Sequence, residues 1–563
     1  MVSRPFSTAL LTGLLGVFFL PIMAGVAYVG MMAFGYFPPL GYNRFSLSIW
    51  RQLFDSPDLW SMLGLSLWVG VVSTLCSLGA ALAIVSALWG SRWWSGITRW
   101  LSPMLAIPHV ALAFGVSFLI MPSGLLGRLL APVADWQYPP DWQTVQDPLG
   151  LSLIAVLILK ETPFLIVLLI AALERLPVKA FLAVGQSLGY TPWMVWVKLL
   201  WPGLYAMVRL PVYAVLAFSL SVVDIALFIG PMNPPVFSVQ LLEWLKDADV
   251  DKRLLACAGG LLLGGIVILA MAGMVVVEHA VAHVGRRWLS RGRRGSRHIS
   301  IQWLSKVLWR WLLITVSGAC GALVIWSFTW RWRFPALWPE DLTLLSWQRA
   351  WPSLSEPLYY SLVTGFLCAL LSVVATVLIL EITAKHSHRV RLGIERLMYI
   401  PMLLPQMSFL FGIQVLLLSV RWDGQLMAVV GAHVLFVLPY CYLSLSGPWQ
   451  SYDQRYSLQG RLLSRSRYKT FIAIKLPLLW RPLVTSFALG FAVSIAQYLP
   501  TIFSGAGRIS TITTEAVALA AGGSRQYMGV YGVMQMLLPM LVYGLALISG
   551  NRSLRTFRKR LTL

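Results

Sequence analysis

Long apolar stretches separated by short polar segments run along the whole chain. A helix that crosses a bilayer needs about 20 mostly apolar residues. Twelve stretches meet this requirement: 8–35, 60–88, 101–122, 150–173, 207–230, 254–282, 307–330, 357–382, 397–420, 425–447, 482–503 and 526–549. The first stretch shows no cleavage pattern, so we expect it to be kept as a helix. The pattern predicts an all-α polytopic membrane protein of about twelve transmembrane helices.

The composition and the placement of charge add an orientation. Of the 563 residues, 58% are hydrophobic and only 12% are charged, which excludes a soluble protein because soluble domains carry about 25% charged residues. With the N-terminus inside, the inward-facing segments hold 31 of the 44 Lys and Arg residues and 5 of the 21 acidic residues. Inner loops of membrane proteins are enriched in Lys and Arg. We therefore expect a bacterial inner membrane protein with both termini in the cytoplasm.

The net charge of +23 is explained by this sidedness. The densest basic run lies between spans six and seven, where we expect it to rest on anionic lipid headgroups. Nucleic acid is not expected as a partner.

The chain is duplicated. The segment 66–70 matches 361–365 at an offset of 295 residues, and Pro202 matches Pro477 at an offset of 275. Internal repeats of this kind indicate two similar structural units. We predict a first transmembrane half, a basic cytoplasmic linker and a second transmembrane half, at residues 1–283, 284–306 and 307–563. Parallel repeats build a transport pathway at their interface.

Two corresponding loops follow spans four and ten, and we predict that each forms a short helix, a turn and a second amphipathic helix on the inner face. In the first loop the second helix is expected to end at Pro202, where the next span begins. The residues of interest in these loops are Gly185, Gln186, Ser187, Leu188, Gly189 and Pro202 in the first half, and Leu458, Gln459, Gly460, Ser464 and Pro477 in the second.

These loops resemble those of the permease subunits of binding-protein-dependent ATP-binding cassette (ABC) importers. The family pattern is E-A-A, three residues, G, and then I-x-L-P with the proline thirteen residues after the glycine, which is the spacing of Gly189 and Pro202. The loops depart from the pattern in five places. Ala183 and Leu458 replace the acidic residue, Gly185 and Gly460 replace the second alanine, and Ser464 replaces the glycine.

The fused halves are most similar to the thiamine and iron(III) permeases of that family. The resemblance implies a type I importer core in which two copies of a separate ATPase each receive one loop. It also implies a periplasmic solute-binding protein that docks on outer segments. The candidates are 236–249 and 510–523, and the alternative is that both are solvated connectors. No G-x-x-x-x-G-K-[ST] motif occurs in the chain, so ATP would be used by the partner and no bound cofactor is expected. No catalytic set, disulfide pattern or metal-ligand spacing is present either.

Ionisable residues inside membrane spans are costly and often functional. In this chain the polar candidates are Lys160, Glu161, His109 and Gln406. We expect them to brace helices near prolines, with gating or solute passage as the alternative. For His109 and Gln406, bracing means satisfying a carbonyl group freed by a kink.

The fifth span of each half lines the pathway in the family that the chain resembles. The pore candidates are Ser219, Asp224, Ser494, Gln497 and Tyr498. Asp224 would favour a cationic solute. The alternative is that Asp224 caps a broken helix or pairs with Lys160.

Two other classes of function remain open at this level. A twelve-span secondary transporter driven by an ion gradient has a similar hydropathy pattern, but the expected charged signature is missing from the loops after spans two and eight. A polytopic membrane enzyme would need paired carboxylates in a large outer loop, and Asp135, Asp141 and Asp147 are the only such group. The sequence does not identify the solute.

Overall fold

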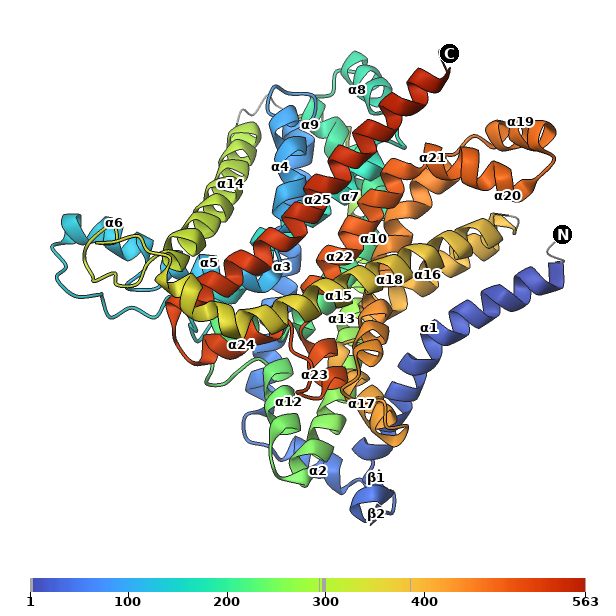
Figure 1. Cartoon of the computed structure of the whole chain (residues 1–563). Helices are drawn as coiled ribbons and strands as arrows, with labels where there is room; N and C mark the ends of the chain where they lie inside the picture. Colours follow the sequence, from blue (N-terminus) through green and yellow to red (C-terminus); the bar gives the residue numbers. More distant parts are fainter. Residues whose placement is uncertain (1–3, 293, 296–299, 385, 562–563) are drawn as a thin grey trace.

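The computed structural model describes residues 4–292, 294–295, 300–384 and 386–561, most of them in helices (Figure 1). Within this part of the chain, ten helices are long and apolar enough to cross a membrane, and two bent helix pairs raise the number to twelve if each pair crosses once. The predicted all-α polytopic fold is confirmed. Arg293 and Arg297 of the basic linker lie outside the described residues.

The long helices follow the predicted apolar stretches. They are α1 (Arg4–Ala33), α3 (Leu59–Leu88), α4 (Trp94–Ala106), α5 (His109–Ile120), α7 (Leu151–Leu173), α10 (Trp201–Ser221), α13 (Val250–Ser290), α14 (Ser300–Ser327), α15 (Leu345–Thr383), α16 (His388–Leu403), α17 (Leu410–Ser419), α18 (Leu426–Gln450), α22 (Trp480–Ile495) and α25 (Arg525–Leu561).

Several predicted spans are broken, and their predicted limits were wrong at these points. Span three is divided between α4 and α5 at Pro108, and span nine bends by 92° between α16 and α17, close to Pro405. Proline has no N–H group to continue the helical hydrogen bonds, which is the local cause of both breaks. Span five ends at Ser221, and span eleven ends at Ile495.

Short elements connect the long helices. They are the strands β1 (Tyr36–Phe37) and β2 (Tyr42–Asn43), the helices α2 (Ser48–Phe54), α6 (Leu125–Ala134), α8 (Val178–Ser187), α9 (Pro192–Val195), α11 (Ala226–Ile229), α12 (Phe237–Lys246), α19 (Gln454–Ser464), α20 (Arg467–Thr470), α21 (Leu476–Leu478), α23 (Leu499–Gly505) and α24 (Ile512–Ala521), the 3-10 turns η1 (Pro38–Leu40) and η3 (Gln406–Ser408), and the π-helical segments η2 (Trp196–Leu200) and η4 (Phe471–Lys475). The two strands pair antiparallel, with Tyr36 opposite Asn43.

Most of the short elements lie toward two ends of the molecule, while α6 stands out at its side (Figure 1). We call the end that carries α8, α9, α19 and α20 the hairpin end, and both chain termini lie toward it. We call the opposite end, with α2, α12, α23 and α24, the loop end.

The two halves make the same tertiary contact at the repeat offsets. The Ser66 hydroxyl accepts a hydrogen bond from the backbone N–H of Phe237 at 2.9 Å, and the Ser361 hydroxyl accepts one from Ile512 at 2.8 Å. Each bond ties the second span of a half to the short helix α12 or α24, so the duplication extends to side-chain contacts.

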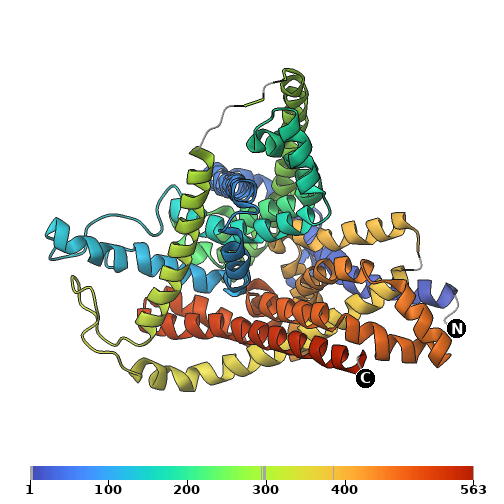
Figure 2. The ribbon, with the colours of Figure 1, turned by 90° about the horizontal axis from the view of Figure 1, so that it is seen from above.

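The first helix of each half packs on the other half. Helix α1 contacts α17, and α14 contacts α5; Figure 2 shows the start of α1 (blue) among the orange helices of the second half. Glycines allow these close approaches. A β-carbon on Gly115 would lie 2.5 Å from the Ala319 carbonyl oxygen, and one on Gly412 would lie 2.0 Å from that of Gly25. The two halves are therefore interlocked through their first helices.

Candidate functional site

The first hairpin, residues 178–200, stands at the hairpin end. Helix α8 ends at Ser187, and Gly189 then adopts a left-handed conformation with φ +82°, which glycine reaches at little cost. The Thr191 hydroxyl accepts from the N–H of Met194 and caps α9. The second helix was predicted to end at Pro202, but it continues, because a proline in the first turn of α10 leaves no broken hydrogen bond.

The second hairpin, residues 454–475, repeats this construction. Ser466, the counterpart of Thr191, caps α20 by accepting from the N–H of Lys469. The left-handed residue is Arg465 with φ +50°, one position later than in the first hairpin. This shift explains why Ser464 can stand in place of a glycine. Its hydroxyl bonds the Gly460 carbonyl at 2.7 Å and lies 3.0 Å from the Thr470 hydroxyl.

Gly185 and Gly460 are the contact points inside the two hairpins. A β-carbon on Gly185 would lie 2.3 Å from the Val195 Cγ2 atom. One on Gly460 would lie 2.4 Å from the Ile474 Cδ1 atom and 2.8 Å from the Thr470 Cγ2 atom. In the sequence these glycines are departures from the family pattern. In the structure they allow the two arms of each hairpin to pack against each other.

The second arm of each hairpin contains a five-residue π-helical segment, η2 and η4, at the same offset of 275 residues. Its lysines differ. Lys475 is buried, lies 2.5 Å from Glu381 and stacks on Trp449 at 4.3 Å. Lys198 lies over the ring of Trp288 at 4.7 Å. The hairpins are thus alike in backbone and different in how they attach to the spans.

The residues at the tips of both hairpins are solvent-exposed. Gln186, Ser187 and Leu188 are exposed in the first hairpin, as are Leu458 and Gln459 in the second. Pro477 begins α21 in the same way that Pro202 begins α10. The structure therefore brings each predicted loop set together on one hairpin and leaves several of its side chains exposed.

Lys160 and Glu161 lie in the middle of α7. Because they are adjacent on a helix, their side chains point in different directions and contact different residues. The Lys160 ammonium donates to the backbone carbonyl groups of Leu105, at 3.0 Å, and Ile107. These carbonyls terminate α4 at the break before Pro108. Lys160 therefore braces a broken helix, which agrees with the expected bracing role.

Glu161 faces His109, whose Nε2 atom lies 3.5 Å from the carboxylate. The His109 ring also lies 5.1 Å from that of Phe218. His109 was predicted to satisfy a carbonyl freed by the kink, but the side chain that does so is Lys160. Gln406, at the matching place in the second half, is half-buried at the start of η3.

The pore candidates fall at matching breaks in the fifth spans. Asp224 lies between α10 and α11, while Gln497 and Tyr498 lie between α22 and α23. Asp224 is half-buried and interacts electrostatically with His109, not with Lys160 as one prediction had it. Tyr498 interacts with Asp224 in turn. The structure thus places an acidic, aromatic cluster where the two halves meet.

The serines of the pore set are less accessible. Ser219 is buried, and its hydroxyl has no hydrogen-bond partner among the described groups. The Ser494 hydroxyl is bonded to His433 Nδ1 at 2.8 Å, and His433 Nε2 lies 2.9 Å from the Thr501 hydroxyl. His433 therefore links the end of α22 to the start of α23, across the break that holds Gln497.

Sequence reasoning missed His433 and Tyr440. Tyr440 is half-buried in α18 and interacts electrostatically with Glu161. An ionisable residue within a membrane span is a signal in itself, and His433 in span ten carried that signal. Tyr440 had no comparable mark.

At the loop end, the predicted outer segments 236–249 and 510–523 form α12 and α24. Thr511 caps α24 through a capping box with Thr514. After α12, Asp247 accepts a 2.7 Å hydrogen bond from the Lys252 ammonium, which holds the pKa of the Asp247 carboxyl below its usual range. An acidic group thus stays ionised at the loop end, next to α12.

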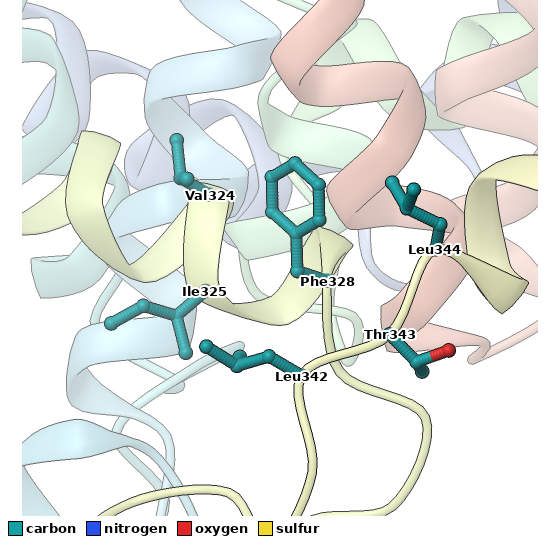
Figure 3. Close-up of a pocket in the computed structure, with 6 residues that line it drawn as sticks. All are labelled: Val324, Ile325, Phe328, Leu342, Thr343 and Leu344. Atoms are coloured by element: carbon teal, nitrogen blue, oxygen red, sulfur yellow. The ribbon is translucent and has the colours of Figure 1, made fainter.

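The pocket in Figure 3 is unrelated to these residues. It lies between the end of α14 and the segment that leads to α15, and it is lined by Val324, Ile325, Phe328, Leu342, Thr343 and Leu344. Its lining holds no charged group and none of the predicted site residues. Within the described ranges, no group of three or more His, Cys, Asp or Glu side chains is arranged to hold a metal ion.

Comparison with known proteins gives one informative relative. No protein-family model matches the chain. The inner membrane ABC transporter permease protein YnjC of Escherichia coli (strain K12) is 32% identical over 500 residues, which cover 89% of this chain and 90% of that protein. The similarity includes both halves and both hairpins. The chain belongs to the family of inner membrane ABC transporter permeases.

Proposed function

We propose that the chain forms the membrane-spanning part of an importer, with the hairpin end in the cytoplasm. Each coupling hairpin docks on one copy of a separate ATPase, and closure of the ATPases rocks the interlocked halves between outward and inward access. The observation that carries this proposal is the pair of hairpins, built alike at an offset of 275 residues and standing at one end with exposed tips. The charge count supports the orientation.

A small solute would arrive at the loop end on a periplasmic binding protein that contacts α12 and α24. It would pass between the halves at the breaks in the fifth spans. Asp224 and Glu161 make this passage acidic, which favours a cationic solute, because a negative charge attracts a cation strongly where the dielectric is low. Membership of the ABC permease family does not favour the alternative of a secondary transporter.

Deletion of residues 183–189 or 458–464 tests the proposal. Each deletion removes the tip of one hairpin and leaves every long apolar helix intact. We expect both variants to insert in the membrane and to lose association with the ATPase, measured by co-purification. Retention of the ATPase by both deletion variants would contradict the docking role.

A further inference from the structure

The two coupling hairpins share a backbone but present different surfaces. Helix α19 exposes Leu462 and Leu463 to 81% and 87%. At the corresponding places the first hairpin has Ser187, the last residue of α8, and Leu188, which is 59% exposed. Large apolar side chains this exposed are typical of a surface that a partner covers. The second hairpin therefore exposes more apolar surface at its tip than the first hairpin does.

The charge of the hairpins differs as well. The second hairpin holds six basic residues and no acidic one: Arg455, Arg461, Arg465, Arg467, Lys469 and Lys475. Lys475 is buried and paired with Glu381, so the other five carry the charge of this hairpin. The same stretch of the first hairpin holds two: Lys179 and Lys198. Neither hairpin has the acidic residue expected at its tip. Both differences favour a partner surface that is apolar at its centre and acidic around it.

The chain's own linker covers part of the first hairpin. The N–H of Thr191 donates to the carbonyl of Arg294 at 3.1 Å. A β-carbon on Gly295 would lie 2.7 Å from the Met194 Cγ atom and 2.9 Å from the Thr191 hydroxyl. This contact lies on the turn between α8 and α9. Of the corresponding residues of the second hairpin, Ser466 is half-buried and Lys469 is exposed.

We propose that α19 is the principal docking element for the ATPase, and that Leu462 and Leu463 enter an apolar pocket rimmed by acidic side chains. The first hairpin makes a weaker contact through Leu188. This inference rests on the proposed function, because it assumes that the hairpins receive an ATPase. It adds the chemistry of the contact and its inequality between the two hairpins.

The same substitution at corresponding positions tests the inequality. The ATPase that co-purifies with the wild-type chain is identified by mass spectrometry, purified alone, and titrated onto the full chain in nanodiscs of neutral lipid. We expect Leu463→Ser to weaken binding at least tenfold and Leu188→Ser to weaken it less than threefold. Leu462→Ser copies the first hairpin and should behave like Leu463→Ser, whereas the reciprocal Ser187→Leu should not weaken binding. Equal or greater loss with Leu188→Ser would overturn the proposal.

A triple variant, R455A/R461Q/K469M, tests the role of the basic residues. At three exposed or half-exposed positions it introduces the residues that stand at the corresponding places of the first hairpin. We expect wild-type binding to weaken several-fold between 50 and 500 mM NaCl, since salt screens surface charges. The triple variant should bind more weakly and depend less on salt. If the triple variant depended on salt as strongly as the wild type, the proposed acidic rim of the pocket would be wrong.

Two further outcomes separate the sources of failure. If the leucine variants lose binding only in nanodiscs that contain anionic lipid, α19 belongs to the lipid surface and the inference is wrong. If the wild-type chain holds no ATPase, or both hairpin deletions retain it, the proposed function itself fails. Equal loss from Leu188→Ser and Leu463→Ser leaves the proposed function intact and contradicts only the inequality.

Discussion

Gly185 lies directly against Val195, so closely that a β-carbon at position 185 would stand 2.3 Å from the Val195 Cγ2 atom. Val195 is buried, and its branched side chain has little freedom to move away. The contact joins the two arms of the first coupling hairpin, and Gly460 makes the equivalent contact in the second.

Gly185→Ala should therefore force the arms apart. We expect a destabilisation of the hairpin of about 1–3 kcal/mol, the usual cost of overpacking a close contact, together with weaker ATPase association and faster proteolysis near α8. Gly203→Ala is the matched control, because no atom lies within 4 Å of its added β-carbon. Equal behaviour of the two variants would show that the close contact is unimportant.

Lys160→Met should lower the stability of the folded protein. The substitution keeps the length of the side chain but leaves the carbonyl groups of Leu105 and Ile107 without their donor. We expect a loss of about 2 kcal/mol or more, measured as a lower midpoint of thermal unfolding in detergent. If stability is unchanged while uptake is abolished, Lys160 acts in transport and not as a brace.

His433→Leu should loosen the break between α22 and α23. The hydroxyl groups of Ser494 and Thr501 would lose their shared partner, at a cost of about 1–3 kcal/mol for buried polar groups. We expect increased labelling of a cysteine placed at Gln497 by a thiol reagent. His433→Gln, which retains polar atoms, should restore part of the wild-type protection, and identical labelling of all three proteins would rule out the linking role.

Asp224→Asn should reduce uptake at least tenfold for a cationic solute, with no effect on ATPase association. The probe is the ligand that co-purifies with the periplasmic binding protein. Asp58→Asn serves as a control, because Asp58 is exposed and its side chain does not cap α3. Uptake that survives Asp224→Asn would remove Asp224 from the solute pathway.

Local sequence patterns predicted the features that depend on neighbouring residues. Hydropathy placed the long helices, and Pro202 marked the start of α10, although the preceding helix does not end there. The repeat predicted that Ser66 and Ser361 occupy matching places, although only the structure showed that they make the same bond.

Contacts between distant residues were not predictable in this way. Lys160 meets carbonyl groups 53 and 55 residues away, and His433 meets hydroxyls at separations of 61 and 68. No local pattern specifies such partners. The shift of the left-handed residue from the place of Ser464 to Arg465 was also hidden, because it follows from one extra residue of helix in α19.

ATP-driven uptake is the most direct test of the account. The chain, its ATPase and the binding protein are reconstituted in liposomes without an ion gradient, with ATP on the side of the coupling hairpins. We predict accumulation of the binding protein's ligand that requires ATP and is lost when residues 458–464 are deleted. Accumulation driven by a proton or sodium gradient in the absence of ATP would contradict the account.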